Sequence, residues 1–282
     1  MRRAVVVLLC LGSAVSAFAQ LPTFNRVYVV LEENTNYSSV VGNSSMPYLN
    51  SLIKNYGLAT QYYADTHPSI GNYFMLTTGQ IITNNDGYTK TVTADNVVRH
   101  LLTAGKTWKA YEEDLPYAGY IKPDVANYAR RHCPLSFLSD VVNSSTQKMN
   151  LVPFTKFAKD LANNALPAYS FITPNLCNDA HNCSLGTADA WLKKNIDPLV
   201  KNSNFKNGDL LIIVFDESAN DNTHGGGRVA WVAISPKYSK GAYKSTKLYQ
   251  HASTLRLMMQ GLGLTSYPGK ASSAPNMAEF FK

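Results

Sequence analysis

The stretch that decides the fold is residues 64–79, Ala64-Asp65-Thr66-His67-Pro68-Ser69-Ile70-Gly71-Asn72-Tyr73-Phe74-Met75-Leu76-Thr77-Thr78-Gly79. Pro68 disfavours helical geometry at His67, so we expect a helix to begin at or just after this pair. The Ser69 hydroxyl then lies at a helix N-terminus, where free N–H groups and the helix dipole favour an anion. Serine is also a favoured helix cap. This stretch alone therefore fits both a capping and a catalytic serine.

Predicted strands and helices alternate along the rest of the chain. Apolar and β-branched runs predict strands at 26–31, 58–64, 107–111, 168–173, 209–215 and 229–235. Apolar periodicity predicts helices at 47–56, 96–104, 153–165, 187–200 and 252–260. We therefore expect an α/β fold, a layered sandwich with a mostly parallel central sheet. Because no repeat or linker interrupts the pattern, residues 20–282 are expected to form a single domain.

Residues 1–19 have the pattern of a secretory signal peptide. Arg2 and Arg3 precede the apolar run 4–11, and small residues at 17 and 19 mark a cleavage site before Gln20. The later sequence has no apolar run of membrane-spanning length, so we expect a secreted or periplasmic protein. The formal charge is +7, or +5 without the two leader arginines. No basic block interleaved with aromatic residues occurs, and a nucleic-acid partner is not expected.

Three cysteines follow the predicted leader, Cys133, Cys177 and Cys183. An oxidising compartment predicts one disulfide and one remaining thiol. Cys177 and Cys183 are the nearest pair in sequence, but pairing of Cys133 with either of them stays open. Because no C-x-x-C pair occurs, a thiolate zinc site is not expected.

Polar side chains able to bind metal or phosphate follow four of the predicted strands. Glu33 and Asn34 follow the first strand, and Asp216 and Glu217 follow the strand at 209–215. Ligands of open α/β sheets bind beyond the carboxyl ends of the strands, so these clusters are expected to converge on one crevice. Oxygen ligands suit a hard divalent cation, and adjacent buried carboxylates repel one another without one. Each pair alone also fits an ordinary turn at a strand end.

Histidines offer further candidates. His181 lies in the loop after the strand at 168–173 and His132 lies beside two arginines, positions suited to a phosphate or metal ligand. His251 fits either a helix-cap contact or a site residue.

The glycine run 225–227 lacks the Lys-Ser/Thr of a P-loop, and we interpret it as a flexible lead-in to a strand. The absence of Gly-x-Ser-x-Gly and His-Glu-x-x-His argues against an α/β-hydrolase esterase and a zincin protease.

With these residues in place, the chain resembles the phosphoesterase family of acid phosphatases and phospholipases C, within the alkaline phosphatase superfamily. The resemblance covers nearly the whole chain after the leader. It rests on eight motifs in order: Glu-Glu-Asn at 32–34, His-Pro-Ser-x-x-Asn-Tyr at 67–73, Trp-Lys-Ala-Tyr-Glu-Glu-Asp-Leu-Pro at 108–116, Arg-His-Cys-Pro at 131–134, Pro-Asn-Leu-Cys-Asn-Asp-x-His at 174–181, Ala-Asp-Ala-Trp-Leu at 188–192, Phe-Asp-Glu at 215–217 and Gly-Gly-Gly-Arg-Val…Ile-Ser-Pro at 225–236.

The resemblance implies an alkaline-phosphatase-like α/β/α sandwich and a covalent phosphoryl-enzyme mechanism. Ser69 would be the nucleophile. Glu33, Asn34, Asp216 and Glu217 would be ligands of one divalent metal ion beside it. A cation in that place would lower the pKa of the serine hydroxyl and neutralise charge during phosphoryl transfer, so no separate general base is needed.

The same resemblance implies contacts to the substrate. The spacing from the nucleophile to Asn72 is similar to the Thr-x-x-Asn of nucleotide pyrophosphatases, in which the Asn contacts phosphate. His67, Asn72 and Asp179 are therefore predicted to bind the substrate phosphate. His132 and His181 are predicted to contact the phosphate or protonate the leaving group.

Two positions depart from the family pattern or lack a role. Asn175 falls where the pyrophosphatases carry a metal-binding aspartate, so the resemblance implies a one-metal site. Cys133 replaces an Asn that usually follows the family's histidine, which is retained here as His132. Glu113 matches a glutamate of the family, and no role is assigned to it.

These residues predict an exported, metal-dependent phosphomonoesterase of the acid-phosphatase type, acting on a small phosphorylated substrate through a phosphoserine. The alternative is a phosphodiesterase, in particular a phospholipase C that cleaves lipid head groups; the compact length favours small monoesters. A non-catalytic binding protein on the same fold would be indicated by loss of Ser69 or of the carboxylates, and all of them are present. The oligomeric state is left open.

Overall fold

A computed structural model describes residues 21–282, so the predicted leader at 1–19 lies outside the described residues. The strands are β1 (Val27–Glu32), β2 (Gly57–Tyr62), β3 (Trp108–Glu112), β4 (Leu151–Pro153), β5 (Tyr169–Thr173), β6 (Leu210–Phe215), β7 (Trp231–Ile234) and β8 (Lys244–Tyr249). They form one eight-stranded sheet of order β4-β3-β5-β1-β6-β7-β2-β8. Only β7 is antiparallel to its neighbours, so the expected mostly parallel α/β sheet is confirmed.

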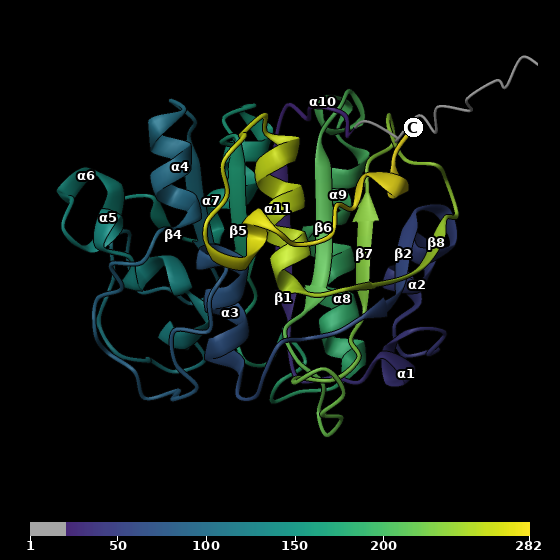
Figure 1. Ribbon diagram of the computed structural model, residues 1–282, viewed down its shortest axis with the longest axis horizontal. Helices are drawn as coiled ribbons and strands as arrows, with labels where there is room; N and C mark the ends of the chain where they lie inside the picture. The colour runs from purple at the N-terminus through teal and green to yellow at the C-terminus, as the bar shows by residue number, and fades with distance from the viewer. Residues whose placement is uncertain (1–20) are drawn as a thin grey trace, which may run out of the picture.

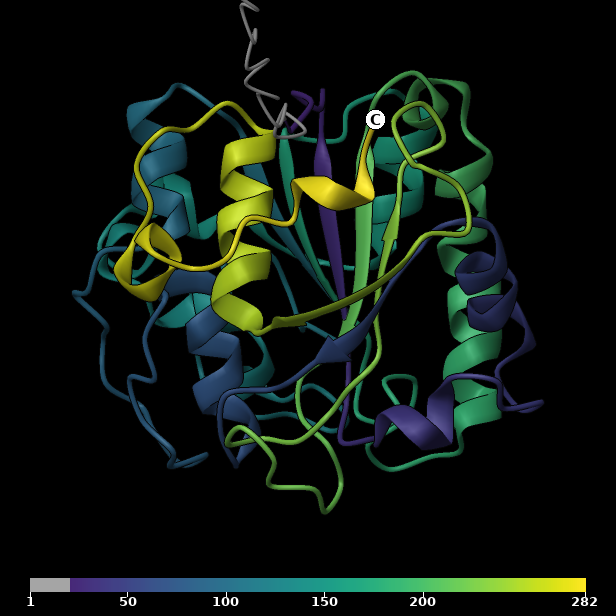
Figure 2. The ribbon, with the colours of Figure 1, turned by 45° about the vertical axis from the view of Figure 1, so that its right-hand side comes forward.

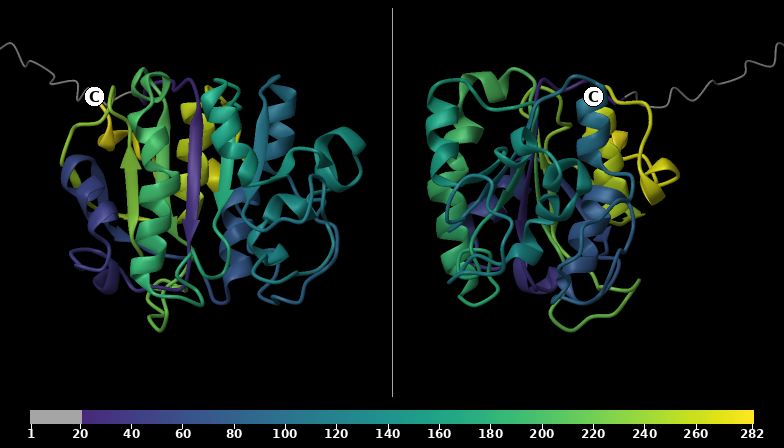
Figure 3. Two further views of the ribbon diagram at one scale, coloured as in Figure 1. Left: turned by 180° about the vertical axis from the view of Figure 1, so that it is seen from behind. Right: turned by 90° about the vertical axis from the view of Figure 1, so that its left-hand side faces the viewer.

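Helices cover both faces of this sheet. The longer ones are α2 (Pro47–Asn55), α3 (Ser69–Thr78), α4 (Val97–Thr103), α7 (Thr155–Ala162), α8 (Leu185–Asn195) and α11 (His251–Gly261). The shorter ones are α1 (Tyr37–Val40), α5 (Ser139–Val142), α6 (Ser145–Lys148), α9 (Asp197–Lys201) and α10 (Ser203–Lys206). Helices α3 and α11 pack together on the face toward the viewer in Figure 1. Figure 2 shows the sheet between this layer and the layer of α2 and α8, and Figure 3 shows α8 in front when seen from behind.

The two central strands, β1 and β6, set the position of the residues that follow them. All residues of β1 and β6 are buried, because helices cover both faces of the sheet there. A parallel strand covered on both faces reads as a continuous hydrophobic run, as residues 27–31 of β1 and all of β6 do. The pairing of β1 with β6 runs in register from Val27↔Leu210 to Glu32↔Phe215. Glu33 and Asp216 therefore leave the sheet side by side.

Three features of the fold differ from the sequence-based expectation. The edge strands β4 and β8 were not predicted, because β4 has three residues and β8 exposes most of its side chains. The single helix expected at 187–200 is two helices, α8 and α9. Pro198 lies in the first turn of α9, where a proline without an N–H fits a helix start and not a helix interior.

The start of α2 is fixed by a residue far along the chain. Its N-cap position, Met46, provides no side-chain hydrogen bond. Instead, Asp189 of α8 accepts hydrogen bonds from the N–H groups of Tyr48 and Leu49, at 2.9 and 2.8 Å. The carboxylate thus satisfies two free donors at the helix N-terminus, and it joins the two helices of this layer.

Candidate active site

The carboxyl ends of the parallel strands meet at one edge of the sheet, the lower edge in Figure 1. The segments that follow β1, β2, β5 and β6 bring Glu33, Ser69, Asp179 and Asp216 to this edge. The predicted convergence of the four polar clusters is therefore what the topology produces.

Ser69 is the first residue of α3 and is 3% exposed. Its Oγ lies 3.2 Å from Glu33 Oε2 and 3.1 Å from Glu217 Oε1. The N-cap residue is Pro68, and α3 has no side-chain cap. The hydroxyl therefore points to carboxylates and does not cap the helix. The next N–H along the helix, that of Ile70, faces Asp86 Oδ1 at 3.4 Å, which shows that this end of α3 accepts an anionic oxygen.

The predicted metal ligands gather around this hydroxyl. Asp216 Oδ1 accepts a hydrogen bond from the Asn34 N–H at 3.0 Å, and Asn34 Nδ2 donates to Glu33 Oε2 at 3.1 Å. Burial and the neighbouring carboxylates raise the pKa of Glu33 and of Asp216 well above their usual range. Burial raises the pKa of Glu217 to about 7. Asp216 Oδ2 is buried without a hydrogen-bond partner. Buried carboxylates that repel one another, with one oxygen unpaired, fit a divalent cation held beside the serine.

Two of the residues predicted to bind phosphate are tied into the turn before α3. Asn72 Oδ1 accepts hydrogen bonds from the N–H groups of Asp65 and Thr66, at 2.9 and 3.2 Å. Its Nδ2 donates to Thr66 O at 2.8 Å and lies 3.5 Å from Glu217 Oε2. His67 Nδ1 lies 2.7 Å from the same Glu217 oxygen. Both side chains are therefore in the site, next to Glu217.

His132 and Asp179 lie on the other side of Glu33. His132 Nε2 is 3.5 Å from Glu33 Oε1, and His132 Nδ1 is 3.7 Å from Asp179 Oδ2. The imidazole stacks on the ring of Tyr73, whose hydroxyl donates to Glu33 Oε1 at 2.5 Å. Burial, together with Arg131 and His181, lowers the pKa of His132 well below its usual range. Burial raises the pKa of Asp179 to about 7.

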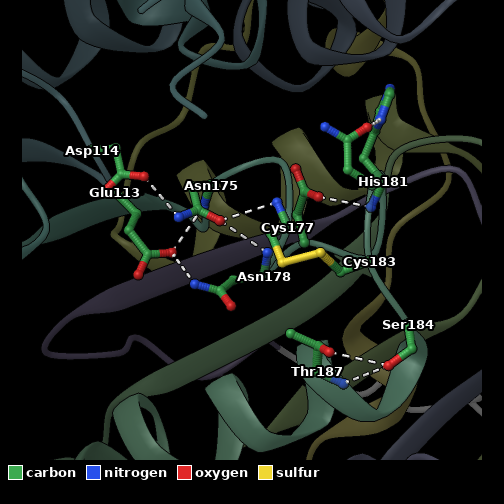
Figure 4. The surroundings of a disulfide bond; sticks show 11 residues. Glu113, Asp114, Asn175, Cys177, Asn178, His181, Cys183, Ser184 and Thr187 are labelled. Atoms are coloured by element: carbon green, nitrogen blue, oxygen red, sulfur yellow. Dashed lines mark hydrogen bonds between the residues drawn. A yellow bond between two sulfur atoms is a disulfide. The ribbon is translucent and has the colours of Figure 1, made fainter. Parts of the chain in front are cut away.

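The loop that carries Asp179 is closed by the disulfide Cys177–Cys183, shown in Figure 4. The expected nearest-pair disulfide is therefore found, and Cys133 is a buried free thiol. His181 is exposed at the rim, with its ring centroid 6.1 Å from that of His132. The backbone N–H of His181 donates a hydrogen bond to Asp179 Oδ1 at 2.8 Å.

Glu113 holds this loop in place. Its Oε2 accepts hydrogen bonds from the Asn175 N–H and from Asn178 Nδ2, both at 2.9 Å. Asn175 directs its own side chain within the loop. Its Oδ1 accepts from the N–H groups of Cys177 and Asn178, and its Nδ2 donates to Asp114 at 2.8 Å. Glu113 thus acquires a role that the sequence did not assign, and Asn175 supports the loop.

His251 holds the backbone of Asp216 through a buried hydrogen bond. Its Nε2 lies 2.6 Å from the carbonyl oxygen of Asp216, so this nitrogen carries the proton. Nδ1 then accepts from the Tyr62 hydroxyl at 3.0 Å, and Tyr62 lies 2.6 Å from the Thr254 hydroxyl. Trp231 Nε1 donates to Thr254 at 2.8 Å, which completes a buried chain of hydrogen bonds running in one direction. The sequence left His251 open between a helix-cap contact and a site residue, and it did not indicate this contact with Asp216.

The glycine run at 225–227 precedes β7, as expected, and it also packs closely against the turn before α3. A Cβ at Gly225 would lie 2.1 Å from Asp65 O, and one at Gly226 would lie 2.4 Å from Thr66 O. Gly226 N donates to Ala64 O at 3.1 Å, and Ala64 N donates to Gly227 O at 2.9 Å. The glycines therefore allow close backbone packing against the turn that delivers Ser69.

Comparisons with known proteins agree with this geometry. The Phosphoesterase family matches residues 25–265. A phosphatidylinositol-3-phosphatase of Mycobacterium tuberculosis is 33% identical over 276 residues, which cover 96% of this chain and 86% of the relative. An acid phosphatase of Aspergillus fumigatus is 33% identical over 269 residues, covering 91% of this chain and 58% of the relative. The chain spans about half the length of the fungal acid phosphatases it matches.

Solved structures show the same fold at low sequence identity. The lipoteichoic acid synthase LtaP of Listeria monocytogenes has a TM-score of 0.63 at 10% identity, covering 92% of this chain and 76% of that chain. Murine ectonucleotide pyrophosphatase/phosphodiesterase 5 has a TM-score of 0.59 at 10% identity, covering 91% and 100%. A Vibrio parahaemolyticus protein of the alkaline phosphatase superfamily has a TM-score of 0.58 at 13% identity, covering 91% and 71%.

Fold and site together define a hydrolase that acts on phosphoric ester bonds, with the α/β fold of the alkaline phosphatase superfamily. The chain belongs to the Phosphoesterase family. Within residues 21–282, none of the helices has the length and apolar character needed to cross a membrane.

Proposed function

We propose that this protein is an exported, metal-dependent phosphomonoesterase of the acid-phosphatase type, in which residues 20–282 form one catalytic domain. It hydrolyses small phosphate esters through a phosphoserine at Ser69. The observation that carries this proposal is the position of the Ser69 hydroxyl, which lies at the start of α3 within 3.2 Å of Glu33 and 3.1 Å of Glu217.

The residues around Ser69 have distinct roles in this proposal. Glu33 and Glu217 accept the hydrogen bond of the hydroxyl and hold the Ser69 oxygen in one orientation, which leaves its lone pairs free to attack a phosphate bound at the start of α3. Glu33, Asn34, Asp216 and Glu217 would hold a divalent cation, with the Asn34 amide turned to present its oxygen. Such a cation supplies a lower pKa for the hydroxyl and neutralises charge on the phosphate.

Phosphate binding uses donors at the same helix end. The Ile70 N–H now faces the Asp86 carboxylate at 3.4 Å, and a phosphate oxygen replaces that carboxylate when substrate binds. Asn72 Nδ2 and the His67 ring lie next to Glu217, where they contact the remaining phosphate oxygens. We assign protonation of the leaving group to His181, and its exposure at the rim supports this assignment. Water then hydrolyses the phosphoserine.

A cavity next to Asp86 gives room for a small organic group. The lining of this cavity of ≈ 340 Å³ includes Asp86, Asp124 and Arg131, and the Asp86 carboxylate faces the N–H of Ile70, the residue after Ser69. The names of two relatives, acid phosphatase and phosphatidylinositol-3-phosphatase, both describe removal of a phosphate monoester. The alternative is a phosphodiesterase of the phospholipase C type, which the same nucleophile would also serve.

Export is supported by two independent features. The predicted leader at 1–19 has the pattern of a cleavable secretory signal. The disulfide Cys177–Cys183 lies in a loop of the site, and disulfides persist in oxidising compartments. We therefore place the mature protein in the periplasm or outside the cell.

Replacing the nucleophile tests the mechanism. Ser69→Ala should lower turnover of an aryl phosphate by at least about 10⁴-fold, because the covalent step is lost, and it should leave the thermal unfolding midpoint unchanged. Acid quenching of the wild type with labelled substrate should trap phosphate on Ser69, as read by mass spectrometry. Ser51→Ala, a surface substitution on α2, is the control. Retained turnover in Ser69→Ala would show that another group is the nucleophile.

A comparison of substrates tests the ester class. We expect kcat/KM to be highest for an aryl phosphomonoester, lower for a bis-aryl phosphodiester and lowest for a phosphatidylcholine dispersion. Preference for either of the last two would replace the monoesterase proposal with the phosphodiesterase alternative.

A further inference from the structure

We propose that the surface formed by Tyr117, Val125 and Met149, with Lys122 and Lys148 beside them, binds an anionic lipid bilayer. All five residues lie in the connection between β3 and β4. The proposal concerns attachment of the protein to a lipid surface, and it does not depend on the reaction proposed for Ser69.

The first support is the exposure of hydrophobic side chains. Within residues 21–282, six large hydrophobic side chains are exposed. The three with the greatest exposure are Met149 at 55%, Tyr117 at 53% and Val125 at 44%. Single exposed hydrophobic residues are common on soluble proteins, whereas several on one surface indicate an interaction site.

Met149 and Tyr117 lie on the same part of this surface. A Cβ at Gly119 would lie 3.3 Å from Met149 Sδ, so the thioether packs over the backbone two residues after Tyr117. The Gly119 N–H donates to Leu151 O at 2.9 Å, which fixes this turn against the start of β4. The two side chains are therefore held together by the fold.

A series of aromatic contacts joins Val125 to them. The Tyr117 ring packs edge to face on Tyr120 with centroids 5.4 Å apart, and Tyr120 packs in the same way on Tyr128 at 5.8 Å. The backbones of Tyr128 and Val125 pair through hydrogen bonds of 2.9 and 3.1 Å. Tyr120 and Tyr128 are buried, so they form a rigid base beneath the exposed side chains.

The free charge on this surface is positive. Residues 117–149 contain four Lys or Arg side chains and two carboxylates, Asp124 and Asp140. Each carboxylate is paired with an arginine at 2.9 Å. In the part of the chain that the structure describes, the lysines that form ion pairs do not include Lys122 and Lys148. These two cations are therefore available to an anionic partner.

An anionic bilayer uses both properties of the surface. Tyrosine side chains favour the head-group level of a membrane, aliphatic side chains enter the acyl boundary, and lysines attract anionic head groups. A small polar anion would leave Tyr117, Val125 and Met149 in water. A neutral apolar partner would not use the two lysines.

The same segment also lines the cavity next to Asp86. The Tyr120 hydroxyl donates to Pro123 O at 2.7 Å, and Pro123 and Asp124 belong to the lining of that cavity. Val125 directly follows Asp124 in the chain. A bilayer that contacts Val125 is therefore held next to the cavity.

Co-sedimentation with vesicles tests this surface. We expect the wild type to bind vesicles of equal parts phosphatidylglycerol and phosphatidylcholine, to bind pure phosphatidylcholine weakly, and to lose affinity as salt is added. Lys122→Gln/Lys148→Gln should lower the partition coefficient about 30-fold, from about fivefold for each lysine. Tyr117→Ser/Met149→Ser should lower it by at least about tenfold, because the apolar contact is lost.

A matched control lies at the other end of the sheet. Leu248 is 43% exposed and Lys244 is exposed on the same strand, β8, which is the edge strand opposite β4. Lys244→Gln/Leu248→Ser should bind the vesicles as the wild type does. The thermal unfolding midpoint should be the same in all variants, which shows that lost binding is not lost folding.

The wild-type result decides the proposal even if a variant does not fold. Wild-type protein that stays in solution with the anionic vesicles would overturn it, and so would unchanged binding by folded Tyr117→Ser/Met149→Ser. Dimers without vesicle binding, broken by the same double variant, would assign the surface to a second copy of the chain instead. Failure of the proposed function is separate, because Ser69→Ala should bind vesicles as the wild type does whatever its turnover.

Discussion

Replacement of one buried acid, Glu112→Gln, should change how stability depends on pH. Glu112 is the last residue of β3 and is 1% exposed. Its Oε1 has no hydrogen-bond partner. Burial raises the pKa of this carboxyl from its ordinary 4.5 to about 8, although the neighbouring Cys133 and Thr173 lower it in part. The folded protein therefore keeps the proton at neutral pH, whereas the unfolded chain releases it.

The sign and size of the effect follow from this difference in proton binding. Between pH 4.5 and pH 8 the folded state binds more protons than the unfolded state, so the free energy of unfolding falls as the pH rises. Each pH unit in this window costs about 1.4 kcal/mol, so the two and a half units from 4.5 to 7 cost roughly 3 kcal/mol. A glutamine has the same shape and carries no such penalty.

Urea unfolding of wild type and Glu112→Gln at pH 4.5 and pH 7 measures this difference. We expect the variant to gain stability relative to wild type by roughly 3 kcal/mol between the two pH values. Asp124→Asn, whose side chain is 53% exposed, controls for the loss of one carboxylate at the surface. A difference between wild type and Glu112→Gln that stays constant from pH 4.5 to pH 7 would refute the reasoning, because Glu112 would then ionise as it does in the unfolded chain.

Three further predictions follow from other parts of the molecule. Asp189→Ala should lower the free energy of unfolding by about 1–3 kcal/mol, because Tyr48 and Leu49 lose their acceptor, and aryl phosphatase activity should be unchanged; equal stability in urea would contradict this. The double variant Cys177→Ser/Cys183→Ser should lower the free energy of unfolding by about 2 kcal/mol, as expected for a short disulfide loop, and should also lower phosphatase activity. Wild-type kinetics in this variant would disprove the second part. Chelation should abolish turnover and lower the unfolding temperature, and a divalent ion should restore both; full activity without metal would remove the cation from the mechanism.

The site could be predicted because its parts follow strands. Glu33 follows β1 and Asp216 follows β6, and the register of these two strands brings the carboxylates together. The segment after β2 places Ser69 at the start of a helix, as Pro68 predicts. An apolar run predicts a buried strand and a proline predicts a helix start, so both features can be recognised without the tertiary structure.

Other features could not be predicted because they depend on contacts between distant segments. His251 reaches the Asp216 carbonyl across 35 residues, and nothing near it in the sequence marks the contact. The glycines at 225–227 suggest a flexible segment in the sequence alone. Their close packing against the backbone of Asp65 depends on a contact between distant segments and could not be predicted. Edge strand β8 is mostly exposed, so it lacks the hydrophobic pattern by which strands are recognised.

The sequence by itself determined the α/β class and the phosphoesterase relationship, because local patterns and ordered motifs encode them, and it singled out the carboxylates that lie beside Ser69. Only the tertiary structure decided how the ionisable groups divide around Glu33. The Ser69 hydroxyl, which also contacts Glu217, lies near one oxygen of Glu33, and His132 faces the other. This division depends on side-chain direction and burial, which arise when β1, α3 and the turn at Arg130–His132 pack together. The pKa of a buried carboxylate is set by that packing.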